Sequence, residues 1–199
     1  MIRRVALLSA LALGIASLAS AAPITYTHSG FGSGTLDGIS FGSLAPVAFT
    51  ITAEGDTDNR QSVFSGPFLA AYFIDNDSAS IEIAGLGTFD FTTPTRFFSN
   101  VQNGIVGFSL AGFFGSDLFN GPDDGGGWDM TTSIGPLAGD GKVWWAPNVN
   151  TDGGALVFNR ADSHATFEAV VGGSVPEPAS LLLIGSGIAL AVRRRVRRA

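Results

Sequence analysis

Apolar and polar side chains alternate along many short segments between residues 22 and 171. In Val47-Ala48-Phe49-Thr50-Ile51-Thr52, for example, every second position carries a large apolar side chain. An alternation of period two is typical of a β-strand that buries one face. The same criterion predicts strands over residues 47–52, 68–74, 79–83, 88–92, 104–111, 142–145, 155–159 and 164–171.

Turn-forming residues separate these segments. Glycine, proline, aspartate and asparagine gather at residues 54–56, 75–77, 121–125 and 150–154, where they favour changes of chain direction. No segment of comparable length has an apolar stripe of helical period. Short strands at a spacing of about ten residues favour an all-β, antiparallel β-sandwich, of which the jelly roll is one form. We expect this domain to span residues 22–171.

The first 21 residues differ from the rest of the chain. Two arginines stand among the first four residues, an apolar run covers residues 5–18, and Ala19-Ser20-Ala21 follows. A basic start, an apolar core and a small-x-small site make up a secretory signal peptide. The sequence therefore predicts cleavage by signal peptidase after Ala21, with Ala19 and Ala21 as its recognition residues. The alternative is a buried N-terminal helix.

The last part of the chain predicts a membrane segment. Residues 172–178 are rich in glycine and proline and predict a linker, and residues 179–192 are mainly apolar. A helix of about fourteen residues rises about 21 Å, less than the ~30 Å hydrocarbon core of a bilayer. We therefore expect a short transmembrane helix over residues 179–199 that serves as a temporary anchor to the inner membrane. Five arginines would hold its end on the cytoplasmic side: Arg193, Arg194, Arg195, Arg197 and Arg198.

Three parts in a fixed order make this tail resemble a known signal. Val175-Pro176-Glu177-Pro178-Ala179-Ser180, the short apolar run and the arginine cluster are similar to the PEP-CTERM sorting signal of Gram-negative bacteria. The same type of segment is also described as an ice-binding-protein C-terminal domain. The resemblance implies recognition of Pro176, Glu177 and Pro178 by exosortase, a membrane transpeptidase. It also implies transfer of the chain to the cell envelope or an exopolysaccharide matrix.

The charge of the middle segment limits its partners. Residues 23–175 contain sixteen Asp and Glu against four Lys and Arg, a balance of −12. A segment so acidic is repelled by phosphate backbones, so nucleic-acid binding is not expected. The chain has no cysteine, which excludes disulfides, thiolate nucleophiles and cysteine-based zinc sites.

Two groups of side chains suggest binding chemistry. Asp56, Asp58, Asp75 and Asp77 put carboxylate oxygens on short loops, and oxygen-rich loops suit calcium. The alternative is that these aspartates form turns with their own backbone. Calcium is thus the single candidate ion, and no other cofactor is expected.

Trp144 and Trp145 form the second group. Neighbouring residues of a strand point to opposite faces, so at least one of these rings should be exposed and able to stack on a sugar. The alternative is that large aromatic side chains pack in the core or at a sheet edge.

Catalytic residues do not emerge from the sequence. His28 and His164 are the only histidines, and the segment 107–111 resembles a nucleophile elbow but lacks its final glycine. We therefore expect no enzyme. The sequence favours an exported, non-catalytic envelope or matrix protein associated with exopolysaccharide. The alternatives are a lectin-like module that binds carbohydrate or calcium, and a secreted hydrolase.

Overall fold

The computed structural model describes residues 22–112, 116–124, 126–147 and 149–172. The predicted signal peptide, the Pro-Glu-Pro segment and the C-terminal helix lie outside the described residues. Strands make up most of the described chain, and one short 3-10 helix, η1, joins β4 to β5. The elements are β1 (Pro23–Gly32), β2 (Gly34–Leu36), β3 (Ile39–Phe41), β4 (Val47–Asp56), η1 (Thr57–Asn59), β5 (Gln61–Ser65), β6 (Phe68–Asp75), β7 (Ser78–Ile83), β8 (Gly87–Asp90), β9 (Thr95–Asn100), β10 (Ile105–Leu110), β11 (Asp117–Asp123), β12 (Ile134–Val143), β13 (Val149–Thr151), β14 (Gly154–Phe158) and β15 (Ala161–Val171).

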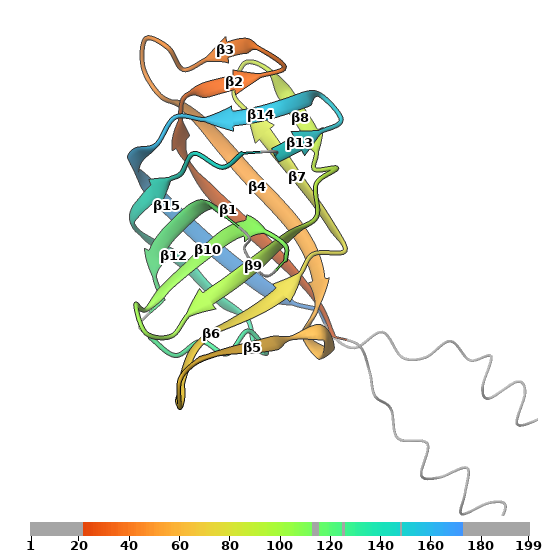
Figure 1. Cartoon of the computed structure of the whole chain (residues 1–199), viewed down its shortest axis with the longest axis vertical. Coiled ribbons are helices and arrows are strands. Elements are labelled where there is room, and N and C mark those ends of the chain that lie inside the picture. Colours follow the sequence, from red (N-terminus) through yellow and green to blue (C-terminus); the bar gives the residue numbers. More distant parts are fainter. Residues whose placement is uncertain (1–21, 113–115, 125, 148, 173–199) are drawn as a thin grey trace, which may run out of the picture. The chain divides into compact units, whose positions relative to one another are not determined.

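One sheet of eleven strands forms most of the fold. Its order is β5-β6-β9-β10-β11-β12-β15-β1-β4-β7-β8, and the neighbouring strands pair antiparallel. The prediction of an all-β, antiparallel fold is therefore confirmed. The two layers come from one continuous sheet that curls over its own core, with β6, β9 and β10 facing β1, β4 and β15 (Figure 1). Strand twist and the bulges in β11 and β12 contribute to this bending.

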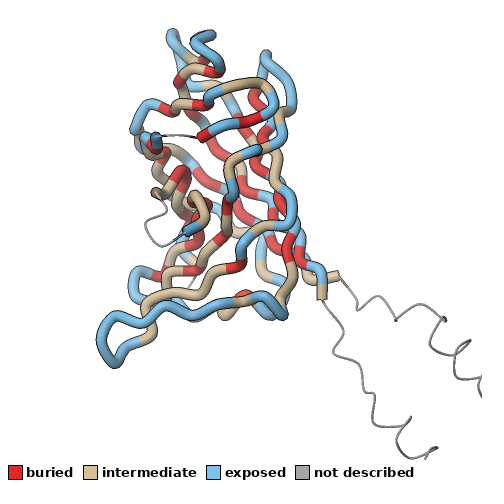
Figure 2. Tube along the Cα trace, turned by 45° about the vertical axis from the view of Figure 1, so that its right-hand side comes forward, coloured by how far each residue is buried: buried red, intermediate tan, exposed pale blue. Residues whose placement is uncertain are grey.

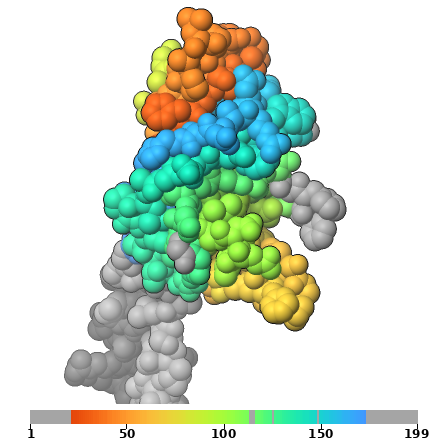
Figure 3. Space-filling model, turned by 90° about the vertical axis from the view of Figure 1, so that its left-hand side faces the viewer, coloured from red at the N-terminus to blue at the C-terminus, as the bar shows by residue number. Residues whose placement is uncertain are grey.

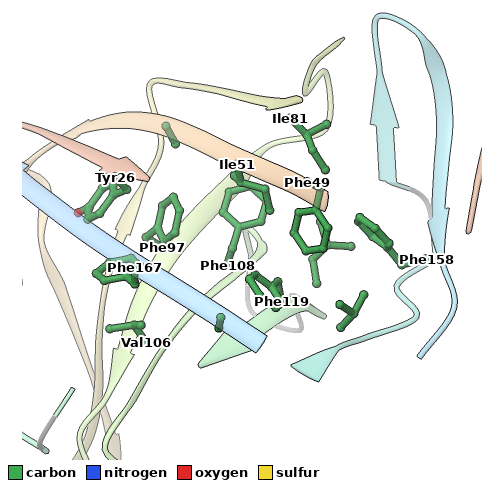
Figure 4. Packing of buried hydrophobic residues seen from close by; sticks show 14 of the residues in the cluster. Tyr26, Phe49, Ile51, Ile81, Phe97, Val106, Phe108, Phe119, Phe158 and Phe167 are labelled. Carbon is green, nitrogen blue, oxygen red and sulfur yellow. The ribbon is translucent and has the colours of Figure 1, made fainter. Parts of the chain in front are cut away.

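Aromatic rings fill the space inside the curled sheet. Tyr26 on β1 stacks on Phe97 of β9 with ring centroids 4.4 Å apart. Phe97 also contacts Phe108 on β10 at 5.0 Å and Phe167 on β15 at 5.9 Å, so that one ring joins both layers (Figure 4). Burying rings of this size removes a large apolar area from water, which is the main force that holds the layers together.

A second sheet closes one end of the core. Its order is β13-β14-β2-β3, and its inward side chains include Leu36, Phe41, Leu156 and Phe158. Phe158 lies 5.0 Å from Phe49 of the large sheet, measured between ring centroids. The burial pattern along the trace shows red inward positions alternating with pale outward ones (Figure 2). The small sheet therefore extends the same core instead of forming another.

Some predicted turns are parts of strands. Gly55 belongs to β4 and pairs with Ile24, and Gly121, Pro122 and Asp123 belong to β11. At Gly55 the absence of a side chain serves packing, because an added Cβ would lie 2.9 Å from Cγ2 of Ile74 on the opposite layer. The prediction of breakers at residues 54–56 and 121–123 was wrong, since a glycine that admits a close neighbour looks like a turn glycine in the sequence.

The described chain begins and ends at the same pole. Strands β1 and β15 are neighbours, with Ile24 opposite Val171, and the Gly172 N–H donates to the Pro23 carbonyl at 2.8 Å. The Thr57 N–H of η1 donates to the Ala22 carbonyl at 3.1 Å, so the turn between β4 and β5 lies there too. We call this end of the fold the terminal pole. The β3–β4 loop lies at the other end of β1 and β4.

His28 lies wholly buried in the core between β1 and β11. Its Nε2 donates to the Gly121 carbonyl, its ring lies 4.2 Å from that of Phe119, and its Nδ1 is buried without a partner in the described chain. Burial lowers the pKa of His28 from 6.5 to about 3, while the bond to Gly121 raises it in part. The ring is therefore neutral in the folded protein at physiological pH.

This neutral histidine predicts acid sensitivity. Below pH 6.5 the unfolded chain binds a proton at His28 that the folded chain excludes, so stability falls with pH towards about 3. The loss should approach about 1.4 kcal/mol for each pH unit. Urea unfolding of His28→Gln between about pH 5 and pH 8 should show a lower but flatter stability. His164→Gln, at an exposed position, should keep the wild-type slope, and an equal slope in His28→Gln would contradict the assignment.

Candidate functional site: an aromatic and charged strip

The outward face of β6, β9, β11, β12 and β15, together with the residues that follow β12, carries aromatic and charged side chains. Strand alternation places them there, because on β9 the buried Phe97 and Ser99 alternate with Arg96, Phe98 and Asn100. We call the outward set the outer strip. Its members are Phe73, Arg96, Phe98, Asp117, Asn120, Asp140, Lys142, Trp144, Trp145 and Asp162.

Three adjoining hollows run along the outer strip. The largest, of about 550 Å³, is lined in part by Asn120, Lys142 and Trp144. A second hollow lies between Asp117 and the two tryptophans, and a third holds Asp117 beside Arg96. Trp144 borders the first two hollows and Asp117 borders the last two, so the three hollows are neighbours on this surface. Such a surface can follow an extended ligand.

Trp144 is fixed at the centre of the strip. Its backbone N–H donates to the Leu118 carbonyl at 2.9 Å. The Arg160 guanidinium lies 4.2 Å from the ring centroid and the Lys142 ammonium 5.5 Å from it, both within cation–π range. The indole Nε1 of Trp144 and Oδ1 of Asn120 are buried atoms without hydrogen-bond partners in the described chain.

Trp145 is the exposed aromatic of the pair, with 60% of its surface accessible. The prediction that both tryptophans belong to a strand was wrong, because β12 ends at Val143 and they follow it. The expected exposure of one ring does hold. Trp128 does not belong to the strip, since it is buried and its Nε1 donates to the Thr132 carbonyl at 2.8 Å.

Polar contacts hold the other end of the strip in place. The Arg96 guanidinium lies 4.6 Å from the Phe73 ring centroid, and its Nε donates to the Ser109 hydroxyl at 3.2 Å. The Asn120 amide donates to the Asp117 carboxylate at 2.8 Å. Burial raises the pKa of Asp117, against the opposing effects of the Asn120 hydrogen bond and the positive charge of Arg96.

Three of the four basic residues between positions 23 and 175 lie on or beside this strip: Arg96, Lys142 and Arg160. The Lys142 ammonium also pairs with the Asp162 carboxylate at 3.2 Å, in an exposed geometry that contributes little to stability. The basic side chains locally offset the negative charge of the domain. The alternation in the sequence did not predict β9 and β11, so it gave no sign that Arg96, Asp117 and Asn120 share one surface.

Of the four candidate calcium ligands, Asp56 forms a turn with its side chain. Asp56 caps η1, where its Oδ1 accepts from the Asp58 N–H at 2.8 Å. Asp75 ends β6, and the Asp77 N–H donates to the Glu54 carbonyl at 2.8 Å. Among the described residues, no three His, Cys, Asp or Glu side chains are placed to hold one metal ion. The expectation of calcium thus receives no support from this part of the chain.

The candidate nucleophile elbow is a strand. Residues 107–110 lie within β10, and the buried Ser109 hydroxyl accepts from Arg96 instead of standing on a sharp turn. His28 points into the core and His164 is exposed on the outer face of β15. Neither histidine is a hydrogen-bond partner of Ser109.

Comparison with known proteins identifies the tail. The model of the PEP-CTERM protein-sorting motif matches residues 174–198. No curated protein and no solved structure matches the chain. The predicted sorting and retention residues lie within the matched segment and outside the described residues. No helix of the described part is long and apolar enough to cross a membrane.

Gly107 on β10 allows the strip to pack. An added Cβ would lie 2.2 Å from Cζ of Phe98 and 2.9 Å from Oδ1 of Asn120. We expect Gly107→Ala to displace Phe98 and to lower the free energy of unfolding by about 1–3 kcal/mol in urea denaturation. Gly127→Ala is the matched control, because a Cβ there meets no atom within 4 Å. Equal stability of the two variants would contradict this packing.

Proposed function

We propose that this chain, which carries a PEP-CTERM sorting motif at residues 174–198, is a non-catalytic protein of the cell envelope or extracellular matrix that associates with exopolysaccharide. The motif marks an exported protein that exosortase processes while its C-terminus is anchored in the membrane. This motif is the observation that supports the first part of the proposal, sorting to the cell envelope or matrix. The outer strip supports the polysaccharide half.

Export and anchoring agree in topology. Signal peptidase would release the N-terminus after Ala21, and the arginines beyond residue 192 would remain in the cytoplasm. The β domain would then lie outside the inner membrane until exosortase acts near Pro176-Glu177-Pro178. Transfer to the cell surface or the matrix would follow.

The outer strip suits a saccharide chain. Trp145 offers an exposed ring that can pack on the C–H face of a sugar. Asn120, Asp140 and Lys142 line the hollow of about 550 Å³ and offer polar groups, and sugar hydroxyls can donate and accept hydrogen bonds. The nearby basic side chains reduce the repulsion that an acidic polysaccharide would meet elsewhere on this domain.

A lectin-like module with one defined ligand is the second candidate. The hollow of about 550 Å³ beside Trp144 favours it, because a short oligosaccharide could fill that space. Binding to long polymers alone would support the matrix role, whereas binding to a single short glycan would support the lectin-like module.

Fractionation tests the sorting. The full chain should pass from the membrane fraction to the envelope or the medium as a shortened product, because exosortase removes the tail. A chain without residues 174–198 should be exported but never membrane-bound. The variant Glu177→Ala should stay in the membrane at full length. An unchanged distribution of both altered chains would contradict a sorting role for the motif.

Binding to a glycan array of neutral and acidic polysaccharides tests the strip. We expect Trp145→Ala to weaken binding about threefold to tenfold, the effect of losing one stacking contact. Phe68→Ala is the control, since this exposed aromatic at the tip of β6 lies outside the strip. Binding that is equal in the two variants would exclude Trp145 as a contact.

A further inference from the structure

The hairpin of β5 and β6 exposes an apolar tip. Phe64 and Phe68 are 63% and 69% accessible, and Val63 is 44% accessible. No charged residue occurs between positions 61 and 74, although the surrounding domain is strongly acidic. The hairpin stands out from the body of the protein (yellow in Figure 3), and β5 is exposed along its length while most of β6 is half-buried (Figure 2). Clustered apolar side chains on a surface mark an interaction site.

The tip is apolar on both faces. Phe64 lies opposite Leu69 and Ser65 lies opposite Phe68, in two successive pairs of the hairpin. Successive pairs point to opposite faces of a β-ribbon, so the two phenylalanines project in opposite directions. A protein surface that docks on one face would leave the other ring in water. A lipid surface that the tip enters would cover both rings.

The hairpin begins at the terminal pole. η1 directly precedes β5, and Thr57 of η1 is hydrogen-bonded to Ala22, beside the pair formed by Pro23 and Gly172. Figure 1 shows β5 and β6 at one end of the domain and β3 at the other. The exposed apolar tip thus belongs to the end of the domain from which both outer segments of the chain depart.

The chain beyond this pole is short. Seven peptide bonds, through the six residues 173–178, link Gly172 to Ala179, where the apolar run begins. Even when fully extended they reach only about 25 Å. A domain tethered by such a segment to a membrane helix keeps its terminal pole within that distance of the lipid surface.

We propose that the β5–β6 tip, with Phe64 and Phe68, enters the lipid interface and seats the domain on the membrane while the chain is anchored by its tail. The contact is apolar, because the segment has no basic residue to bind anionic headgroups. Since this seating requires the anchored chain, it rests on the proposed function. It ends when exosortase releases the domain.

The absence of cysteine makes a direct test available. Single variants Phe64→Cys, Phe68→Cys and Leu44→Cys of the full chain are labelled with a polarity-sensitive fluorophore and reconstituted in phosphatidylcholine vesicles that contain a nitroxide-labelled lipid. Leu44 is the matched control, because it is fully exposed and apolar but lies in the β3–β4 loop. The ten-residue strands β1 and β4 place this loop about 30 Å from the terminal pole. Labels at Phe64 and Phe68 should show blue-shifted emission and several-fold stronger quenching by lipid than the label at Leu44.

Each other outcome overturns the inference in its own way. Equally aqueous labels at all three positions in vesicle-bound chains would exclude the seating but leave the anchoring intact. A blue shift at Phe64 that grows with protein concentration and is insensitive to the lipid quencher would assign the tip to a second copy of the chain. A chain that fails to enter vesicles would contradict the anchoring itself, a result that fractionation would show independently.

Discussion

The pairing of the first strand with the last holds this fold together. β1 lies between β4 and β15 at the centre of the curved layer, and its inward residues Tyr26 and His28 reach the rings of β9 and β11 on the facing layer. Phe97 contacts rings from both layers, so the layers cannot separate without exposing the largest side chains of the core. Because β15 contributes one of these contacts, the core is complete only when the chain has been delivered as far as Val171.

The same alternation that fills the core creates the outer strip. The one inward phenylalanine of β9, Phe97, lies between the outward neighbours Arg96 and Phe98. β10 presents Gly107 between them and Asn120, which brings the polar and aromatic groups of β9 and β11 together. The binding surface we propose thus depends on the strand register. A slip of one residue would send its side chains into the core.

The closure of β1 on β15 also orients the protein. Both outer segments leave from one pole, which carries the start of the β5–β6 hairpin, and ten-residue strands separate this pole from the β3–β4 loop. The outer strip lies on the outward face of the large sheet. A domain held at its terminal pole would leave that side free for a polymer outside the membrane. Seating would then use the hairpin tip and binding the outer strip, two surfaces that adjoin at Val63, which lines the third hollow.

The sequence alone determined the sorting signal and the all-β fold class of this protein. The sorting motif at residues 174–198 is a local, ordered signal, and the alternation of side chains reports strands directly, so both could be predicted. Tertiary structure decided the rest. Gly55 resembles a turn residue in the sequence, but in the fold Ile74 packs against it. Trp144 is positioned by the Arg160 guanidinium over its ring and by its backbone hydrogen bond to Leu118. Arg96, Asp117 and Asn120 could not be assigned to a surface because β9 has two adjacent phenylalanines and β11 contains Gly121 and Pro122, so neither strand shows a plain alternation. Periodicity records which face of a strand is buried, but only packing decides which strands share that face.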